Sequence, residues 1–262
     1  MDTHDDQNLS DAETMRRSWE ARAESDPLYA IDARRRTWEI QDFYSQGPQL
    51  VREIVDPALR ILSVDPSGAR VLEIGCGMGR LFEGLSERFA EVWGTDISSG
   101  MIEQGRAQCP VEAKWFLGDG VSLEGVTSEA IDHVLSYEVF EHVPKPSIIQ
   151  GYFGETLRVL RPAGTFQAQL RGGSDSFRQK LVRGMPRPLR VASAAVLRRL
   201  GVLPVQGDID TWLGCILSPK EAVSMLGAIG FVDVEALNSD FNGVPQAATV
   251  TYWVVGRKPA NP

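Results

Sequence analysis

The amino-acid sequence predicts an α/β protein with a Rossmann-like, seven-stranded, mostly parallel sheet. Short apolar segments of strand length alternate with helix-like segments over residues 48–170, and the pattern resumes over 218–262. A glycine-rich turn directly follows the first strand segment. A chain of 262 residues is long enough for one such domain with additional segments, and it can bury a large core.

The order of the elements supports this fold class. Apolar residues recur at helical spacing over residues 48–62, where Pro57 is expected to kink or restart the helix. Strands that alternate with helices form βαβ units, which place the strands in a parallel sheet covered on both faces. Because His133 falls on an apolar strand, it is predicted to be structural. Strands are predicted at residues 70–74, 91–95, 113–117, 131–137, 165–170, 231–235 and 249–255, with helices at 81–89, from 99, at 152–160 and at 219–230.

Residues 171–217 interrupt the alternation. Eight Arg and Lys residues oppose the single acid Asp175 between Arg171 and Arg199, and two prolines break the segment. We predict an inserted basic helical cap, whose cations form a solvated face, a membrane-surface patch or a wall that binds a polar acceptor. Beyond it, Ser218 and Glu221 have the spacing of a capping box for a helix that begins at Pro219.

The N-terminal region divides into two parts. Residues 1–12 are acidic and carry almost no apolar side chains, so they are predicted to form a disordered tail. Residues 13–47 combine large aromatic side chains with Arg34, Arg35 and Arg36. This mixture suits either a helical lid over a pocket or a simple packed helix pair. Exposed aromatic helices in this region also suit a homodimer.

Composition argues against several classes of protein. The formal net charge of -8 disfavours a general nucleic-acid binder, which needs clustered cations. No apolar run approaches the roughly 20 residues that span a bilayer, and the acidic N-terminus does not resemble a secretory signal. Cys76, Cys109 and Cys215 fit neither a disulfide framework nor a cysteine zinc site. The sequence therefore predicts a cytoplasmic protein with reduced thiols.

A glycine loop and an acid form the first candidate site. The sequence Glu73-Ile74-Gly75-Cys76-Gly77-Met78-Gly79 joins a strand to a helix, where glycines let the backbone approach a ligand. Asp96 ends the next strand about 20 residues later, the position from which an acid binds ribose hydroxyls. A dinucleotide fingerprint would continue with glycine where Arg80 stands. This departure disfavours a nicotinamide oxidoreductase.

These motifs, in this order, resemble those of the class I S-adenosylmethionine-dependent methyltransferases, and among them the small-molecule "type 11" branch. The resemblance rests on "VLEIGCGMG", "WGTDISSGMIEQGR", "GDG" and "LSYEVFEHVP" with "LRPAGTF" over residues 71–170, and it continues over 218–258. The N-terminal aromatic and basic segment resembles that of actinobacterial sugar O-methyltransferases, such as those acting on methylmannosides.

The resemblance implies where S-adenosylmethionine binds. Its methionine portion would lie against the glycine loop, with Glu73 supporting the loop, and Asp96 would bind the ribose. For the adenine-side residues a structural role is the alternative: core packing for Ile97 and Met101, and turn formation for Asp119. The implied cofactor residues are Glu73, Gly75, Gly77, Gly79, Asp96, Ile97, Met101, Asp119, Gly120 and Tyr137.

A second candidate site follows the fourth strand, in "LSYEVFEHVP". If a helical turn starts directly after the strand, Glu138, Glu141 and His142 project from one face and converge. Within the family, Glu-x-x-Glu-His resembles the magnesium site of ubiquinone-pathway and small-RNA O-methyltransferases, which implies Mg²⁺ bound by all three residues. The alternatives are His142 as sole general base, or residues that only cap a helix and bind backbone.

The predicted function is S-adenosylmethionine-dependent methyl transfer to a hydroxyl of a small acceptor, with a sugar or oligosaccharide favoured and Mg²⁺ assisting. Two alternatives stay open. One is methylation of a lipid, quinone or amine without a metal, and the other is a non-catalytic cofactor-binding module.

Overall fold

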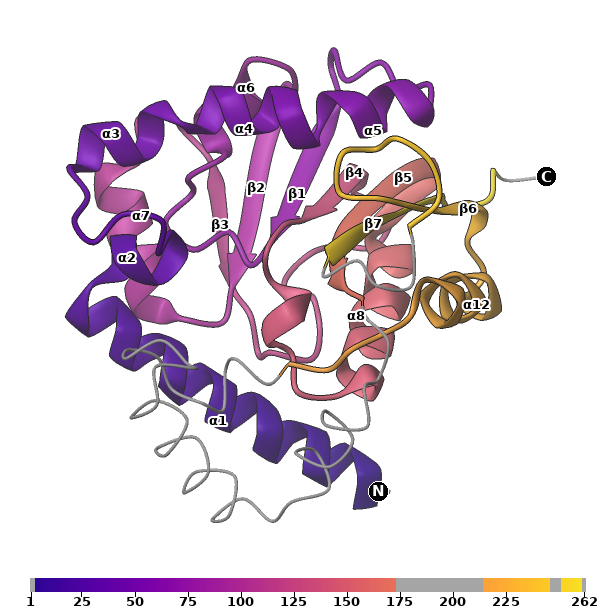
Figure 1. Cartoon of the computed structure of the whole chain (residues 1–262), viewed down its shortest axis with the longest axis horizontal. Helices are drawn as coiled ribbons and strands as arrows, with labels where there is room; N and C mark the ends of the chain where they lie inside the picture. The colour runs from indigo at the N-terminus through magenta and orange to yellow at the C-terminus, as the bar shows by residue number, and fades with distance from the viewer. Residues whose placement is uncertain (1–2, 173–213, 246–250, 261–262) are drawn as a thin grey trace.

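The core of the molecule is a seven-stranded sheet. Figure 1 shows the computed structural model of the chain, which describes residues 3–172, 214–245 and 251–260. The strands are β1 (Arg70–Ile74), β2 (Glu91–Asp96), β3 (Lys114–Leu117), β4 (Ile131–Ser136), β5 (Leu160–Arg171), β6 (Val232–Leu237) and β7 (Thr251–Arg257). Their order is β3-β2-β1-β4-β5-β7-β6. The first five strands are parallel, and β7 runs antiparallel to β5 and β6, which confirms the predicted fold class.

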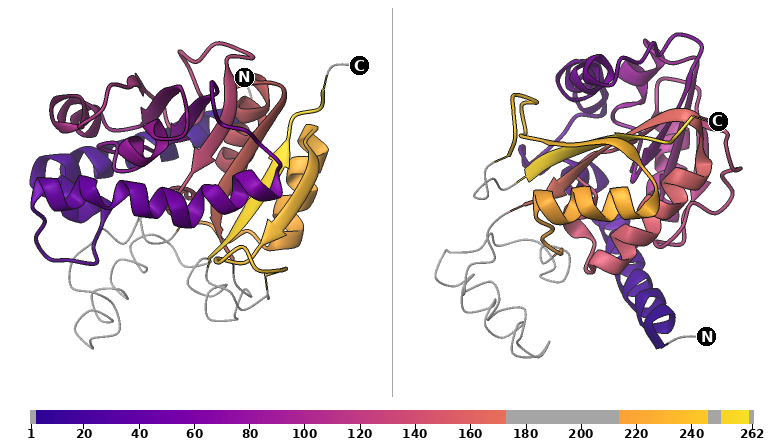
Figure 2. Two further views of the ribbon diagram at one scale, coloured as in Figure 1. Left: turned by 90° about the horizontal axis from the view of Figure 1, so that it is seen from above. Right: turned by 90° about the vertical axis from the view of Figure 1, so that its right-hand side faces the viewer.

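Helices cover both faces of this sheet. Successive residues of β1 point to opposite faces, so that Val71 packs under α4 to α6 and Leu72 packs under α8 and α12. Figure 2 shows the same two layers from other sides. The helices are α1 (Thr3–Ser25), α2 (Pro27–Ile31), α3 (Ile40–Ser45), α4 (Gly47–Ile54), α5 (Asp56–Ile61), α6 (Phe82–Ser86), α7 (Ser99–Gln108), α8 (Pro146–Val159), α12 (Pro219–Ile229) and the 3-10 helix η1 (Phe140–His142).

Several local predictions are confirmed. Pro57 does restart the helix, because α4 ends at Ile54 and α5 begins at Asp56 with Pro57 in its first turn. Ser218 and Glu221 form the predicted capping box at the start of α12. His133 is fully buried between Thr165 and Gln167, which bond to its two ring nitrogens.

Other predictions differ from the structure. The backbone of α1 is helical from Thr3, which differs from the disordered tail that composition predicted for residues 1–12. The composition of these residues gives no sign that they continue a helix whose later turns pack against the rest of the protein. Residues 173–213, which make up most of the predicted basic cap, lie outside the described residues.

The topology creates a crevice at one edge of the sheet. From β1 the chain runs to β2 and β3 on one side and then crosses to β4 and β5 on the other. The carboxyl ends of β1 and β4 therefore border the point at which the strand order reverses, the usual ligand site of such sheets. In Figure 1, α1 crosses this edge below the strands. In the described part of the chain, every helix is too short or too polar to span a membrane.

Candidate active site

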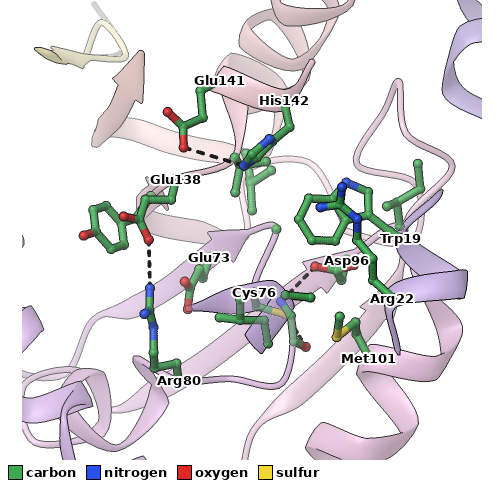
Figure 3. Close-up of a pocket in the computed structure, with 18 of the residues that line it drawn as sticks. Trp19, Arg22, Glu73, Cys76, Arg80, Asp96, Met101, Glu138, Glu141 and His142 are labelled. Atoms are coloured by element: carbon green, nitrogen blue, oxygen red, sulfur yellow. Dashed lines mark hydrogen bonds and ion pairs between the residues drawn. The ribbon is translucent and has the colours of Figure 1, made fainter. Parts of the chain in front are cut away.

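A cavity of about 500 Å³ occupies the crevice. Its walls come from the glycine loop after β1, the end of β2, the β4–η1 connection, α1, and the turn after α2. Figure 3 shows the side chains that face it. Segments far apart in the sequence therefore contribute to one site.

The glycine loop forms the floor of the cavity. Gly75, Gly77 and Gly79 have φ values of 71°, 53° and 79°, a left-handed conformation that favours glycine. A Cβ on Gly75 would lie 2.3 Å from Val139 Cγ2, and one on Gly77 would lie 2.9 Å from Ile31 Cδ1. Gly75 and Gly77 line the cavity, whereas Gly79 is outside its wall and packs against aromatic rings.

Asp96 links the end of β2 to this loop. Its Oδ2 accepts a hydrogen bond from Gly77 N at 2.8 Å, and its Oδ1 accepts one from Ser98 N at 2.9 Å. Burial raises the pKa of Asp96, although these backbone donors oppose the shift. Each carboxylate oxygen can accept a further bond, so Asp96 can also bind hydroxyl groups in the cavity.

Glu73 contributes a buried carboxyl group with one oxygen that has no hydrogen-bond partner. Its side chain is buried, and no described atom forms a hydrogen bond with its Oε2. Burial raises its pKa to about 8, and Asp96 adds to the shift while Arg80 opposes it. A buried polar atom without a partner at a cavity wall is the group that a bound polar or cationic ligand would satisfy.

The residues predicted to surround an adenine divide into two groups. Ile97 and Met101 line the cavity, and Met101 also packs with Tyr44 in a buried cluster. Asp119 and Gly120 are outside the cavity wall. Asp119 Oδ1 accepts hydrogen bonds from the backbone N–H groups of the two residues after Gly120, which fits the alternative of a turn former.

Glu138, Glu141 and His142 do not converge as the sequence predicted. Glu138 has a φ of 57° and lies before η1, so it is not on the same helical face as the other two. Its Oε2 accepts a hydrogen bond from Arg80 Nη2 at 3.0 Å, whereas Glu141 Oε1 lies 3.6 Å from His142 Nε2. Among the described residues, no group of three or more His, Cys, Asp or Glu side chains is placed to hold a metal ion. The predicted three-residue magnesium site therefore does not fit this geometry.

Aromatic side chains border the outer part of the cavity. The ring of Trp19 from α1 meets the His142 ring edge-on, with centroids 5.4 Å apart. The Arg22 guanidinium lies 4.8 Å from the Trp19 centroid. Tyr137 stacks on Trp253 at 5.9 Å, and burial together with Glu138 raises its pKa. Figure 3 shows Trp19 and Arg22 facing the cavity beside His142.

Sequence reasoning missed two buried charges at this site. Asp32 and Arg80 line the cavity and form an ion pair with an Nη1–Oδ2 distance of 2.9 Å. In the sequence, Arg80 stands out only as a departure from a glycine fingerprint. A cation directly after a glycine loop, where the helix must pack closely on the sheet, was the signal for a buried partner.

Comparisons with known proteins identify a methyltransferase domain in the chain. Residues 71–164 match the family model described as a methyltransferase domain. The chain is 33% identical over 122 residues to the biotin biosynthesis bifunctional protein BioHC of Cellvibrio japonicus, covering 46% of this chain and 23% of that protein. It is 30% identical over 159 residues to the ubiquinone biosynthesis O-methyltransferase of Pseudomonas fluorescens, covering 56% of this chain and 55% of that protein. The match therefore spans about half or less of these relatives' length.

A solved structure shares the fold over nearly the whole chain. The crystal structure of magnesium protoporphyrin IX methyltransferase from Synechocystis PCC 6803 with bound SAH matches with a TM-score of 0.59 at 15% identity, covering 95% of this chain and 99% of that chain. At this identity the likeness establishes the fold. The matched family model shows that residues 71–164 form a methyltransferase domain, and the chain shares its fold with this solved methyltransferase.

Proposed function

We propose that this protein transfers a methyl group from S-adenosylmethionine to a hydroxyl group of a small acceptor. The observation that carries the proposal is the meeting of the glycine loop, Asp96 and the Glu141–His142 pair at one cavity. The bound cofactor would supply an electrophilic methyl group on a sulfonium. The remaining task of the protein is to align the acceptor oxygen at roughly 3 Å and remove its proton.

Each part of the cavity has a proposed role. Glu73 would neutralise a cationic part of the cofactor, because its unpaired Oε2 is buried at the cavity floor. Asp96 would accept hydrogen bonds from ribose hydroxyls, and Ile97 with Met101 would contact the adenine. His142 would take the acceptor proton, with Glu141 holding the imidazole in orientation at 3.6 Å.

A sugar hydroxyl is the favoured acceptor, and the N-terminal segment that resembles sugar O-methyltransferases supports this choice. A phenolic acceptor is the second candidate. It is supported by the aromatic wall of Trp19 and Tyr137 and by the similarity to a ubiquinone biosynthesis O-methyltransferase. Aromatic walls stack on planar rings and on the apolar faces of sugars, so the two acceptors require a direct test.

Methyl transfer from labelled cofactor to panels of sugars and phenols tests the proposal. Calorimetric binding of S-adenosylhomocysteine comes first, because a protein that does not bind it cannot have this function. Parallel reactions with EDTA and with Mg²⁺ test the magnesium prediction independently of the geometry. Tight cofactor binding without turnover on any acceptor would instead support a non-catalytic binding module.

A further inference from the structure

A chain of ion pairs crosses the cavity and joins three separate parts of the sequence. Arg80 donates from Nη1 to Asp32 Oδ2 at 2.9 Å and from Nη2 to Glu138 Oε2 at 3.0 Å. The side chains of Asp32 and Arg80 are 2% and 7% exposed, whereas that of Glu138 is 43% exposed. This series of ion pairs is thus buried at Asp32 and Arg80 and exposed at Glu138. Figure 3 shows the Arg80–Glu138 half of it.

Asp32 connects this chain to the N-terminal segment, defined as residues 26–45. Its carboxylate also accepts a hydrogen bond from Arg34 Nε at 2.8 Å, and its carbonyl oxygen accepts one from Trp38 Nε1 at 2.7 Å. The same segment contacts the glycine loop through Tyr44, whose hydroxyl donates to Met78 O at 3.0 Å. A shift of this segment therefore displaces the Asp32 carboxylate.

Glu138 connects the chain to the acceptor side of the site. Its φ of 57° is uncommon for a residue with a side chain, and such a conformation persists only where contacts hold it. The bond from Arg80 is such a contact, and η1 with Glu141 and His142 begins two residues later. The guanidinium is a rigid planar fork, so moving one bound carboxylate tends to move the other.

We propose that Arg80 is a positioning residue that couples docking of the N-terminal segment to the conformation of residues 137–143. The inference rests on the proposed function only in assigning residues 137–143 to the acceptor side. No described hydrogen bond or ion pair joins Asp32 directly to residues 137–143. A purely local role of the Asp32–Arg80 pair would therefore leave those residues unchanged when Asp32 is altered.

Hydrogen–deuterium exchange of the full chain without ligand tests the coupling. Asp32→Asn keeps the shape of the side chain but removes its charge, and we expect amide exchange over residues 137–143 to become about tenfold faster. Arg80→Gln should have the same effect. Arg80→Lys keeps the charge but not the planar fork of the guanidinium, so its amide exchange rate over residues 137–143 should be intermediate. This variant replaces Arg80→Gln if the latter does not fold.

The matched control is Arg88→Gln. Arg88 forms a two-bond ion pair with Asp56, is mostly buried, and lies outside the cavity. The Arg88→Gln variant should have a lower free energy of unfolding, but amide exchange at residues 137–143 should not become faster. Unchanged exchange there in Asp32→Asn, or the same increase in Arg88→Gln, would overturn the coupling. Calorimetry of the wild type with S-adenosylhomocysteine is run separately, so that absent binding rejects the proposed function and leaves the coupling result intact.

Discussion

Glu20 of α1 binds Ser99 at the first turn of α7. Its Oε1 accepts hydrogen bonds from Ser99 N at 2.7 Å and Ser99 Oγ at 2.8 Å, and its Oε2 accepts bonds from Ser98 Oγ and Gly100 N. Partial burial raises the pKa of Glu20, but these bonds outweigh it and the pKa lies below the ordinary value. The carboxylate thus satisfies N–H groups that a helix leaves unpaired at its N-terminus. Because α7 also carries Met101, this contact links α1 to the cofactor side of the cavity.

Glu20→Gln is expected to weaken this link. The amide presents one acceptor oxygen in place of two, and the loss of charge-assisted bonds should lower the free energy of unfolding by about 1.5 to 3 kcal/mol. Affinity for S-adenosylhomocysteine should fall with it, as measured by calorimetry. Glu24→Gln, on an exposed position of the same helix, is the control. Equal behaviour of the two variants would show that Glu20 does not hold α1 in place.

Gly75→Ala is expected to distort the cavity floor. The new Cβ would lie 2.3 Å from Val139 Cγ2, and the φ of 71° is unfavourable for alanine by about 1 to 2 kcal/mol. Gly68→Ala is a matched control, because its φ of 76° carries the same backbone cost with no atom within 4 Å of the new Cβ. Urea unfolding should show a larger loss for Gly75→Ala, and only that variant should lose S-adenosylhomocysteine binding. A second change, Val139→Ala, should partly restore it.

Local sequence signals predicted most of the fold. Pro57 restarts a helix because it lacks an N–H group, and Ser218 with Glu221 caps α12 by bonds between near neighbours. Apolar segments of strand length marked the strands in the same way. These signals work because the interactions that they reflect span only a few residues.

The site was less predictable, because its contacts join distant residues. The Arg80–Asp32 pair spans 48 positions, and no periodicity in the sequence reports it. The predicted convergence of Glu138, Glu141 and His142 required a helical turn that starts directly after β4. The left-handed φ of Glu138 breaks that continuity, and Glu138 accepts a hydrogen bond from Arg80. Asp96 and the glycine loop were predictable because a strand end and its turn are adjacent in the sequence.

Glu141→Gln and His142→Gln are expected to separate catalysis from cofactor binding. If His142 takes the acceptor proton and Glu141 orients it, each variant should lose methyl transfer by about a hundredfold or more. Both should retain S-adenosylhomocysteine binding, because neither residue is among those assigned to the cofactor. The measurement is labelled methyl transfer beside calorimetry, with the exposed Glu103→Gln on α7 as control. Full turnover in either variant would remove that residue from the proposed mechanism.

Glu73 should make the stability of the unliganded protein depend on pH. Its pKa is about 8 in the folded protein against 4.5 for the free side chain, mainly because of burial. Between these values the folded state holds a proton that the unfolded state has lost, so the free energy of unfolding should fall as pH rises from about 5 to about 8. The contribution of this one group is at most about 1.4 kcal/mol per pH unit.

Glu73→Gln should remove this contribution, because the amide stays neutral in both states. Urea unfolding of the wild type and of Glu73→Gln at about pH 5.5, 6.5 and 7.5 compares how steeply the free energy of unfolding of each protein changes with pH. The wild type should lose more stability than the variant at each step towards high pH. Parallel curves would mean that Glu73 is already ionised in the folded protein without a ligand, so that burial does not raise its pKa.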